Sequence, residues 1–239
     1  MPAPISPTLA LLDAATRPYR DSGRFHYYFA RGKLGRDPAF FALLRQGLIP
    51  DHVRLLDLGC GQFLLAALLF AARAQFDRGT WPADWTPAPI PGSFHGIELR
   101  ANVVAAGQAA LGDRVTLRRG DICETEFPAS DVVVILDVLH YIDAASQERV
   151  LAKVAACLHA GGRLLLRVGD AAAGWSFLVT RMTDQLITMA RGAVWPSFHC
   201  RSLSEWIALL ERFGFVVRPE PMNQGTPFAN VMLIAHKKG

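Results

Sequence analysis

Three acidic side chains end or follow apolar, strand-like runs, and each could bind a cationic or hydroxyl-bearing group. Asp57 lies in LLDLGCG, Glu98 ends SFHGIE and Asp121 lies in RRGDIC. Ligands of open α/β sheets bind beyond the carboxyl ends of the strands, where such side chains meet. A single acid of this kind is often a helix cap or a loop residue. The three together predict a ligand site.

The turn after Asp57 carries two glycines, Gly59 and Gly61, before an apolar, helix-like run. Such a turn offers backbone N–H groups and a helix N-terminus to a nucleotide. The dinucleotide pattern G-x-G-x-x-G fails because its third position is Leu64, and no Gly-Lys-Ser/Thr follows for a P-loop. Since Asp57 would repel phosphate and attract a cation, we expect an adenosyl cofactor that lacks phosphates and carries positive charge.

The other two acids suit the same ligand. A carboxylate at Glu98 can accept hydrogen bonds from both hydroxyls of a ribose, and Asp121 can accept one from the adenine amino group. Ile122 would add a backbone N–H and an apolar face for the ring. These assignments predict the orientation of the nucleoside along the sheet edge.

From about residue 50 onward, short β-rich runs alternate with helix-patterned segments, which favours a mostly parallel sheet covered on both faces. About ten residues join the last two strands, too few for a parallel crossover, so this pair is expected to be an antiparallel hairpin. The expected strands are 53–57, 93–98, 115–118, 131–136, 163–168, 214–218 and 228–236, and the expected helices are 62–75, 100–111, 144–159, 174–191 and 203–212.

Local signals set several boundaries. Asp143 is a candidate N-cap for the helix over 144–159, which Gly161 and Gly162 would end. Ser202 with Glu205 fits a capping box.

Two segments interrupt the alternation. Residues 1–50, with many aromatic and basic side chains, are predicted to form a helical cap or lid, and residues 51–239 the main domain. The proline-rich stretch 76–92 is predicted to be an ordered insertion loop.

The motifs LLDLGCG, GIEL, GDI and ILDVLHYID, followed by AGGRLLLRVGD and the terminal hairpin, resemble class I S-adenosylmethionine-dependent methyltransferases. The resemblance covers about residues 50–239. It implies a Rossmann-like α/β fold with a seven-stranded, mostly parallel sheet, an antiparallel C-terminal hairpin, and S-adenosyl-L-methionine as cofactor. The residues that it assigns to the cofactor are Asp57, Gly59, Cys60, Gly61, Glu98, Leu99, Asp121, Ile122 and Asp137, the last bordering the reacting end.

Two departures from the family pattern stand out. The family often has a third glycine where this chain has Phe63, so the backbone approaches differently there or Phe63 closes over the cofactor. The spacing from Asp57 to Glu98 is also about twice the usual one, which we assign to the 76–92 insertion.

A finer resemblance is to stand-alone methyltransferases of aryl-polyene and polyketide pigment pathways. It rests on RPYRDSGRFHYYFARGKLGRDP, DVLHYID, LLRVGDA and GTPFANV. It implies an aromatic or polyketide-type acceptor, either free or bound to a carrier protein.

Methyl transfer to a hydroxyl or an activated carbon needs a proton acceptor, and His140, three residues after Asp137, is the best-placed candidate. The alternative is a histidine that shapes the pocket, together with Tyr141. His26 and His199 are weaker candidates for the base. The absence of an Asn/Asp-Pro-Pro-Tyr/Phe motif at 137–140 argues against methylation of a planar base amine.

Composition narrows the function classes. The chain of 239 residues is 51% hydrophobic and 19% charged, as in globular proteins. Its four cysteines are far apart, so we expect free thiols and no metal site. Net charge is +4 without a basic stripe, so no nucleic-acid partner is expected. No apolar run reaches membrane-spanning length and no secretory signal opens the sequence, which predicts a cytoplasmic location.

Three other functions stay open at this point: an RNA methyltransferase, a non-catalytic subunit that binds the cofactor, and an NAD-dependent oxidoreductase. The sequence does not predict the oligomeric state.

Overall fold

The structure is a computed structural model that describes residues 6–169, 199–222 and 230–239. The chain divides into two compact units, Met1–Ile122 and Cys123–Gly239, and each is described by itself. The helix predicted over 174–191 and the first residues of the strand predicted at 228–236 lie outside the described residues.

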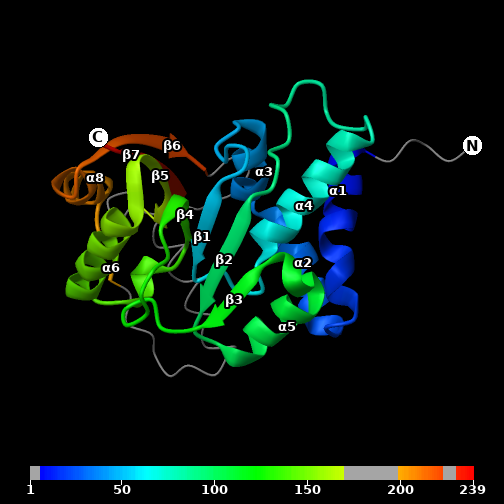
Figure 1. Cartoon of the computed structure of the whole chain (residues 1–239), viewed down its shortest axis with the longest axis horizontal. Helices are drawn as coiled ribbons and strands as arrows, with labels where there is room; N and C mark the ends of the chain where they lie inside the picture. Colours follow the sequence, from blue (N-terminus) through cyan, green and yellow to red (C-terminus); the bar gives the residue numbers. More distant parts are fainter. Residues whose placement is uncertain (1–5, 170–198, 223–229) are drawn as a thin grey trace, which may run out of the picture. The chain divides into compact units, whose positions relative to one another are not determined.

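The first unit contains three parallel strands in the order β3-β2-β1 (Figure 1). They are β1 (Arg54–Leu58), β2 (Ser93–Glu98) and β3 (Thr116–Arg119). The register pairs Asp57 with Gly96 and Glu98 with Arg119. Since all three strands run in the same direction, the predicted ligand-binding acids of this unit lie at the carboxyl ends of the strands, on one side of the sheet.

Helices surround these strands, and most of them precede β1. They are α1 (Pro7–Thr16), the 3-10 turn η1 (Arg17–Arg20), α2 (Arg24–Arg36), α3 (Pro38–Arg45), α4 (Leu64–Asp77), α5 (Ala101–Leu111) and the 3-10 turn η2 (Gly112–Arg114). The N-terminal segment is therefore helical, as predicted. Buried side chains surround α4 on most sides, and α1 packs against it, as expected for a helix of nearly uniform apolar sequence.

The insertion between α4 and β2 is ordered by aromatic contacts. Trp85 packs edge-on against Phe41 and Trp81, with ring centroids 6.0 and 5.3 Å apart, and the Thr86 hydroxyl donates to the Leu44 carbonyl at 2.7 Å. The loop enters β2 at its amino end, away from the edge that carries Glu98 (Figure 1). The loop thus lengthens the spacing from Asp57 to Glu98 while both residues keep their places at the carboxyl ends of β1 and β2.

The second unit contains four strands in the order β4-β5-β7-β6. They are β4 (Ser130–Leu136), β5 (Leu158–Gly169), β6 (Phe215–Pro221) and β7 (Asn230–Lys237). β4 and β5 are parallel, whereas β7 runs antiparallel to both β5 and β6, which confirms the predicted hairpin.

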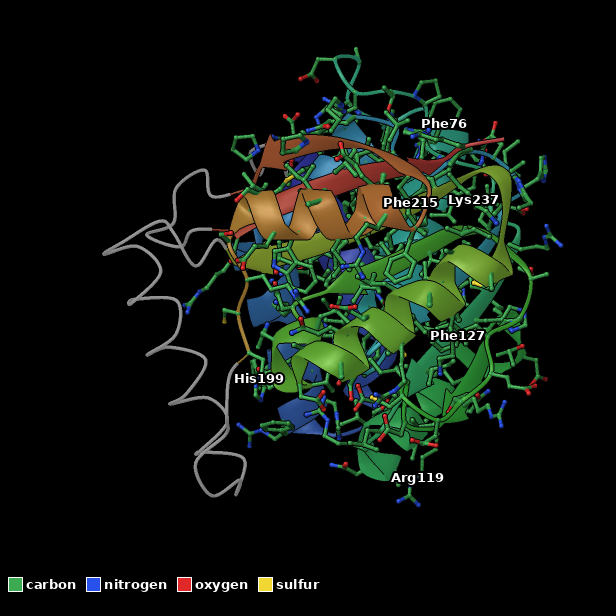
Figure 2. All side chains as sticks on the ribbon, turned by 90° about the vertical axis from the view of Figure 1, so that its left-hand side faces the viewer. Phe76, Arg119, Phe127, His199, Phe215 and Lys237 are labelled. Atoms are coloured by element: carbon green, nitrogen blue, oxygen red, sulfur yellow. The ribbon has the colours of Figure 1, made fainter. Side chains whose placement is uncertain are left out.

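The described residues of this unit also form η3 (Leu139–Tyr141), a 3-10 turn, and the helices α6 (Ala144–Cys157) and α8 (Leu203–Arg212). Figure 2 looks onto α6 and α8, which lie in front of the strands of this unit. The labelled Lys237 at the end of β7 donates to the carbonyls of Ala155 and Leu158, both at 2.6 Å, and so ties the hairpin to the end of α6.

The described residues thus contain seven strands, mostly parallel, with an antiparallel C-terminal hairpin and flanking helices. This confirms the predicted class I methyltransferase fold. All four cysteines are free thiols, as predicted. Within the described ranges, no helix combines the length and the apolar sequence that crossing a membrane requires.

The predicted helix caps are confirmed, but the end of α6 differs from the prediction. Asp143 accepts a hydrogen bond from the Ser146 N–H at 2.9 Å, and Ser202 with Glu205 forms the capping box. The helix predicted over 144–159 ends at Cys157, and the two glycines lie inside β5. A Cβ at Gly162 would lie 2.9 Å from the His159 carbonyl oxygen and 3.3 Å from that of Asp131, and Gly161 has φ 78°, so the two glycines permit a tight local bend at the start of β5 and do not end the helix.

Candidate functional site

The glycine turn lies against the neighbouring strand β2. Gly59 and Gly61 have positive φ angles of 70° and 58°, which favour glycine. The N–H groups of Gly59 and Cys60 both donate to the Ile97 carbonyl, at 2.8 and 3.2 Å. The turn from β1 into α4 is thereby fixed beside the end of β2, where Glu98 follows.

Glu98 organises this turn. Its Oε2 atom accepts the Gly61 N–H at 3.0 Å, and its Oε1 atom accepts both the backbone N–H and the side-chain Nε–H of Arg100, at 3.0 and 2.9 Å. The Glu98 side chain is 7% exposed, whereas that of Arg100 is 45% exposed. A carboxylate offers about four acceptor positions, so the exposed guanidinium occupies one that a ribose hydroxyl could use.

Asp57 is buried beside Glu98 and makes no hydrogen bond or ion pair with any residue that the structure describes. Burial raises the pKa of Asp57 to about 8, and the Glu98 charge adds to the rise. A buried carboxylate without a partner is costly in its charged form. A ligand that brings a positive group to Asp57 would remove this cost, so these residues fit a cationic adenosyl cofactor.

Cys60 points into the unit. Burial raises the pKa of its thiol, and Asp57 and Glu98 raise it further, so the group stays protonated. A Cβ at Gly96 would lie only 2.7 Å from the Cys60 Sγ atom, which shows how closely the thiol packs on β2. The side chain of Cys60 therefore belongs to the core, and its backbone N–H and carbonyl pair with the Ile97 carbonyl and the Phe63 N–H.

The segment after β3 lies beside the end of β2, because the Gly120 N–H donates to the Glu98 carbonyl at 3.0 Å. Asp121 is exposed and Ile122 is buried. Leu99, directly after Glu98, is 62% exposed, an unusual degree of exposure for a leucine. The predicted ribose and adenine contacts of this unit are thus brought together.

Phe63 adopts the left-handed conformation that a glycine would take, with φ 62° and ψ 48°. Its ring is fully buried, and a Cβ at Gly96 would lie 3.2 Å from its Cδ1 atom. Phe63 therefore adopts a backbone conformation that glycine favours, and its ring packs into the core and does not close over a ligand.

The second unit holds the other two predicted residues, Asp137 and His140. Asp137 has φ 58°, a strained conformation for a non-glycine residue. Arg167 of β5, 2% exposed, donates from Nε to Asp137 Oδ1 at 2.8 Å and from Nη2 to Oδ2. The Asp137 charge is therefore already matched by a buried arginine in a two-point pairing that fixes the carboxylate.

His140 lies in η3, with its ring centroid 4.1 Å from that of Tyr141. Burial lowers the pKa of His140; Arg167 lowers it as well, and Asp137 opposes them. The imidazole is thus neutral near pH 7, as a general base must be. The backbone N–H of His199 donates to the His140 carbonyl at 3.0 Å, so His199 contacts the η3 turn through its backbone.

Four buried polar residues support these turns and were not singled out in the sequence: Tyr19, Gln62, Gln147 and Arg167. Gln147 donates from Nε2 to the carbonyls of Leu139, Ile142 and His199, at 3.1, 3.2 and 2.7 Å. The one available signal was Arg167, a charge inside the apolar run LLLRV, which predicts a buried partner.

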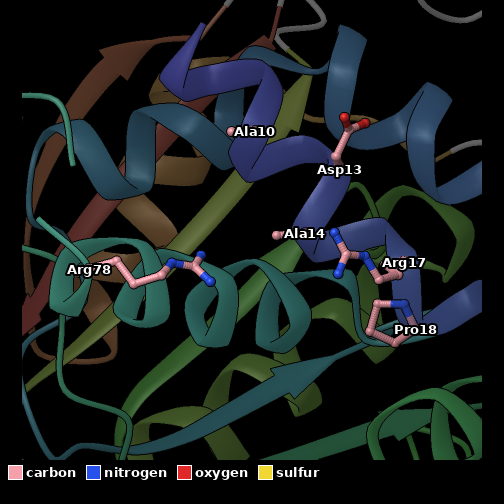
Figure 3. Close-up of a pocket in the computed structure, with 6 residues that line it drawn as sticks. All are labelled: Ala10, Asp13, Ala14, Arg17, Pro18 and Arg78. Carbon is pink, nitrogen blue, oxygen red and sulfur yellow. The ribbon is translucent and has the colours of Figure 1, made fainter. Parts of the chain in front are cut away.

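A hollow of about 340 Å³ lies in the first unit, beside α1 and η1 (Figure 3). It is lined by Ala10, Asp13, Ala14, Arg17, Pro18 and Arg78. None of the predicted site residues lines it, so we do not assign the cofactor to it.

Residues 56–164, from β1 into β5, match the family model described as a methyltransferase domain. This part of the chain is therefore similar to methyltransferase domains, as the sequence motifs predicted. A search of curated proteins finds no match.

Several solved structures share the fold of this chain. They include the pyocyanin biosynthetic protein PhzM (20% identity, TM-score 0.61, 88% of this chain and 57% of that one). Human N-acetylserotonin methyltransferase in complex with S-adenosylmethionine has 16% identity and a TM-score of 0.61, with 100% and 61% covered. Magnesium protoporphyrin IX methyltransferase from Synechocystis, with bound S-adenosylhomocysteine, has 17% identity and a TM-score of 0.59, with 96% and 98% covered. The chain spans about three fifths of the length of the first two.

Proposed function

We propose that this methyltransferase transfers the methyl group of S-adenosylmethionine to an oxygen or carbon of a small acceptor. The choice of cofactor is inferred from the Asp57 carboxylate, which lies buried beside Glu98 at the glycine turn without a partner among the described residues. A pyrophosphate would meet two acids there, whereas an ammonium and a ribose diol would satisfy them. Two of the similar structures hold S-adenosylmethionine or its product, which supports the same choice.

The proposed roles follow the geometry of each unit. Bound S-adenosylmethionine supplies a methyl group on a positive sulfur, open to in-line displacement. Asp57 would bind the positive end of the cofactor, with the backbone of Gly59, Cys60 and Gly61 forming the adjoining wall. Glu98 would accept the ribose hydroxyls. Further contacts would come from Leu99, Asp121 and Ile122 for the adenine, and from Asp137 for the reacting end.

His140 is the proposed general base. An acceptor hydroxyl would lose its proton to an imidazole nitrogen of His140 as its oxygen forms the new bond to the methyl carbon. The lowered pKa of His140 keeps that nitrogen unprotonated near pH 7. Proton transfer of this kind contributes about 10²–10⁴-fold to a rate.

The acceptor is proposed to be an aromatic or polyketide-type compound, free or carried by a protein. The similar structures are named for small molecules: N-acetylserotonin, magnesium protoporphyrin IX and pyocyanin. The aryl-polyene assignment rests on the resemblance of the sequence segments 17–38, 137–143, 165–171 and 225–231.

The test is incubation with isotope-labelled S-adenosylmethionine and a panel of aryl acids, free and as carrier-bound thioesters, followed by mass spectrometry. A product heavier by one labelled methyl group is expected. His140→Ala should then lower turnover by about 10²–10⁴-fold, with His199→Ala as the matched control. A loss of turnover below tenfold would mean that His140 shapes the pocket and is not the general base.

A further inference from the structure

The N-terminal segment of the first unit is fastened to the glycine turn by a buried tyrosine. Tyr19 of η1 is fully buried, and its hydroxyl lies 2.8 Å from the Gln62 carbonyl oxygen and 3.3 Å from that of Phe63. These two carbonyls belong to the residues that lead from Gly61 into α4. A residue more than forty positions earlier in the chain therefore holds the backbone on which the proposed cofactor site is built.

A second attachment joins the same two segments through side chains. The Gln62 amide, 2% exposed, donates from Nε2 to the His26 carbonyl at 2.9 Å, and its Oε1 atom lies 2.9 Å from His26 Nδ1. Because a carbonyl can only accept, the orientation of the amide is fixed, and His26 must carry a proton on Nδ1. Gln62 thus contacts both the backbone and the ring of one residue of α2.

The contacts of Tyr19 and Gln62 lie at a residue with a strained backbone, Phe63. Phe63 keeps a left-handed backbone, which is unfavourable for a non-glycine residue. On its other side the turn has no free space, since a Cβ at Gly107 of α5 would lie 2.9 Å from the Gln62 carbonyl oxygen. Tyr19 therefore holds the strained residue and its neighbour from one side while α5 confines them from the other.

We propose that Tyr19, His26 and Gln62 are positioning residues for the cofactor. They hold the turn from Gly61 to Phe63 in its binding conformation and take over the part that a third glycine plays in the family pattern. The segment 17–26 is then a structural part of the cofactor site as well as a cover. The inference rests on the proposed function of the turn as an S-adenosylmethionine site.

Reciprocity gives the proposal a measurable consequence. If attachment of the segment favours cofactor binding, cofactor binding must favour attachment by the same factor. Amide hydrogen exchange in residues 24–36 should therefore slow when S-adenosylhomocysteine is added to the full chain. The same addition should slow exchange less when an attachment is missing.

The experiment compares Tyr19→Phe and His26→Ala with wild type. Phenylalanine keeps the buried ring and removes only the hydroxyl, so the fold is preserved. Ser22→Ala is the matched control, because Ser22 ties the same segment to the Ala106 carbonyl of α5, at 3.0 Å, and not to the turn. His26→Asn is the conservative variant, since its amide can still donate to Gln62.

Affinity for S-adenosylhomocysteine is measured by calorimetry and exchange by mass spectrometry. Tyr19→Phe and His26→Ala should each bind about fivefold to thirtyfold more weakly, the usual effect of one lost hydrogen bond to a buried group. Ser22→Ala should stay within about twofold, and His26→Asn should recover part of the loss.

The outcomes separate this inference from the proposed function. If wild type binds S-adenosylhomocysteine and both variants bind equally tightly, the positioning role is wrong and the proposed function stands. A variant with a lowered melting temperature and unchanged affinity also contradicts the positioning role, because its contact is then structural. If wild type itself does not bind, the proposed function is rejected, and this inference with it.

Discussion

At the scale of single residues, the first unit contains an electrostatic imbalance that a ligand could remove. Glu98 shares its charge with three donors, whereas Asp57 lies beside it without any partner among the described residues. The result is a carboxyl whose pKa is raised to about 8. Titratable residues with strongly shifted pKa values are typical of functional sites.

Asp57→Asn is expected to stabilise the ligand-free protein at pH 8 and to abolish tight cofactor binding. The native state holds the Asp57 proton more tightly than the unfolded chain, so this carboxyl lowers stability progressively as pH rises from about 4 to 8. Asparagine removes that loss. The free energy of unfolding at pH 8 should rise by up to about 5 kcal/mol, and affinity for S-adenosylhomocysteine should fall at least about tenfold.

Denaturant unfolding at pH 5 and pH 8 checks the direction of this pH dependence. The difference in the free energy of unfolding between Asp57→Asn and wild type must be smaller at pH 5. Asp84→Asn, at an exposed position of the insertion loop, is the control and should change neither quantity. An equal difference at both pH values would mean that Asp57 does not titrate as described.

Arg100→Met is expected to leave cofactor affinity unchanged or to raise it by up to about tenfold. The Arg100 Nε–H occupies the Oε1 atom of Glu98 that a ribose hydroxyl would need. Methionine keeps the aliphatic stem and removes the side-chain donor, so that Oε1 keeps only the backbone N–H of residue 100 and can accept a ribose hydroxyl. Calorimetric titration with S-adenosylhomocysteine measures the effect, and Arg119→Met serves as control, since the Arg119 side chain donates to backbone, at the Leu99 carbonyl. Binding weakened more than about fivefold would place Arg100 among the cofactor contacts.

At the scale of elements, buried glutamines fasten the turns that carry the site. Gln62 joins the glycine turn to α2, and Gln147 of α6 joins the η3 turn to the chain segment at His199. An amide suits this task because it donates and accepts at once without charge. Short turns with few backbone hydrogen bonds of their own are thereby held rigid.

Gln147→Leu should lower both stability and turnover. It removes the Gln147 donor from the carbonyls of Leu139, Ile142 and His199, of which Leu139 keeps the Ile142 N–H, at a cost of about 1–3 kcal/mol. The η3 turn that carries His140 would loosen, so the turnover number should fall more than cofactor affinity. Thermal melts and single-turnover methylation measure the two effects.

Ser202→Ala provides the comparison for this prediction. It removes the cap of α8 and costs about 1 kcal/mol, but leaves the η3 turn intact. Equal turnover losses in both variants would indicate a general effect of lower stability, with no special part for Gln147.

The sequence predicted the helices and strands better than the tertiary contacts that hold the turns between them. Alternating apolar runs and caps such as Ser202 and Asp143 are local signals, and they located β2 and α8 at their observed bounds. The two glycines after α6 were misread, because the same residue type that ends a helix also permits the tight bend that they form inside the first part of β5. For the same reason the Tyr19 and Gln62 contacts, between residues 43 apart in sequence, left no pattern to read.

At the scale of the whole molecule, the fold by itself does not choose the ligand. Open α/β sheets of this kind serve many chemistries, so the residues of the site must decide. The glycine turn is shared in outline with dinucleotide enzymes, and the absent third glycine and the acid pair distinguish it. A ligand that binds only the native state raises its stability, which makes the melting temperature of the full chain a direct test.

S-adenosylhomocysteine at about one hundred times its dissociation constant should stabilise the protein by about 2.7 kcal/mol. For a chain of this length that corresponds to a rise in melting temperature of roughly 5–10 °C. NADH at the same concentration should shift it by less than about 1 °C, because its pyrophosphate would meet Asp57 and Glu98. Asp57→Asn provides the control, since affinity at least about tenfold weaker should reduce its shift with S-adenosylhomocysteine to about half or less at the same concentration. A larger shift with NADH than with S-adenosylhomocysteine would reverse the assignment, and would mean that the acid pair does not define the ligand.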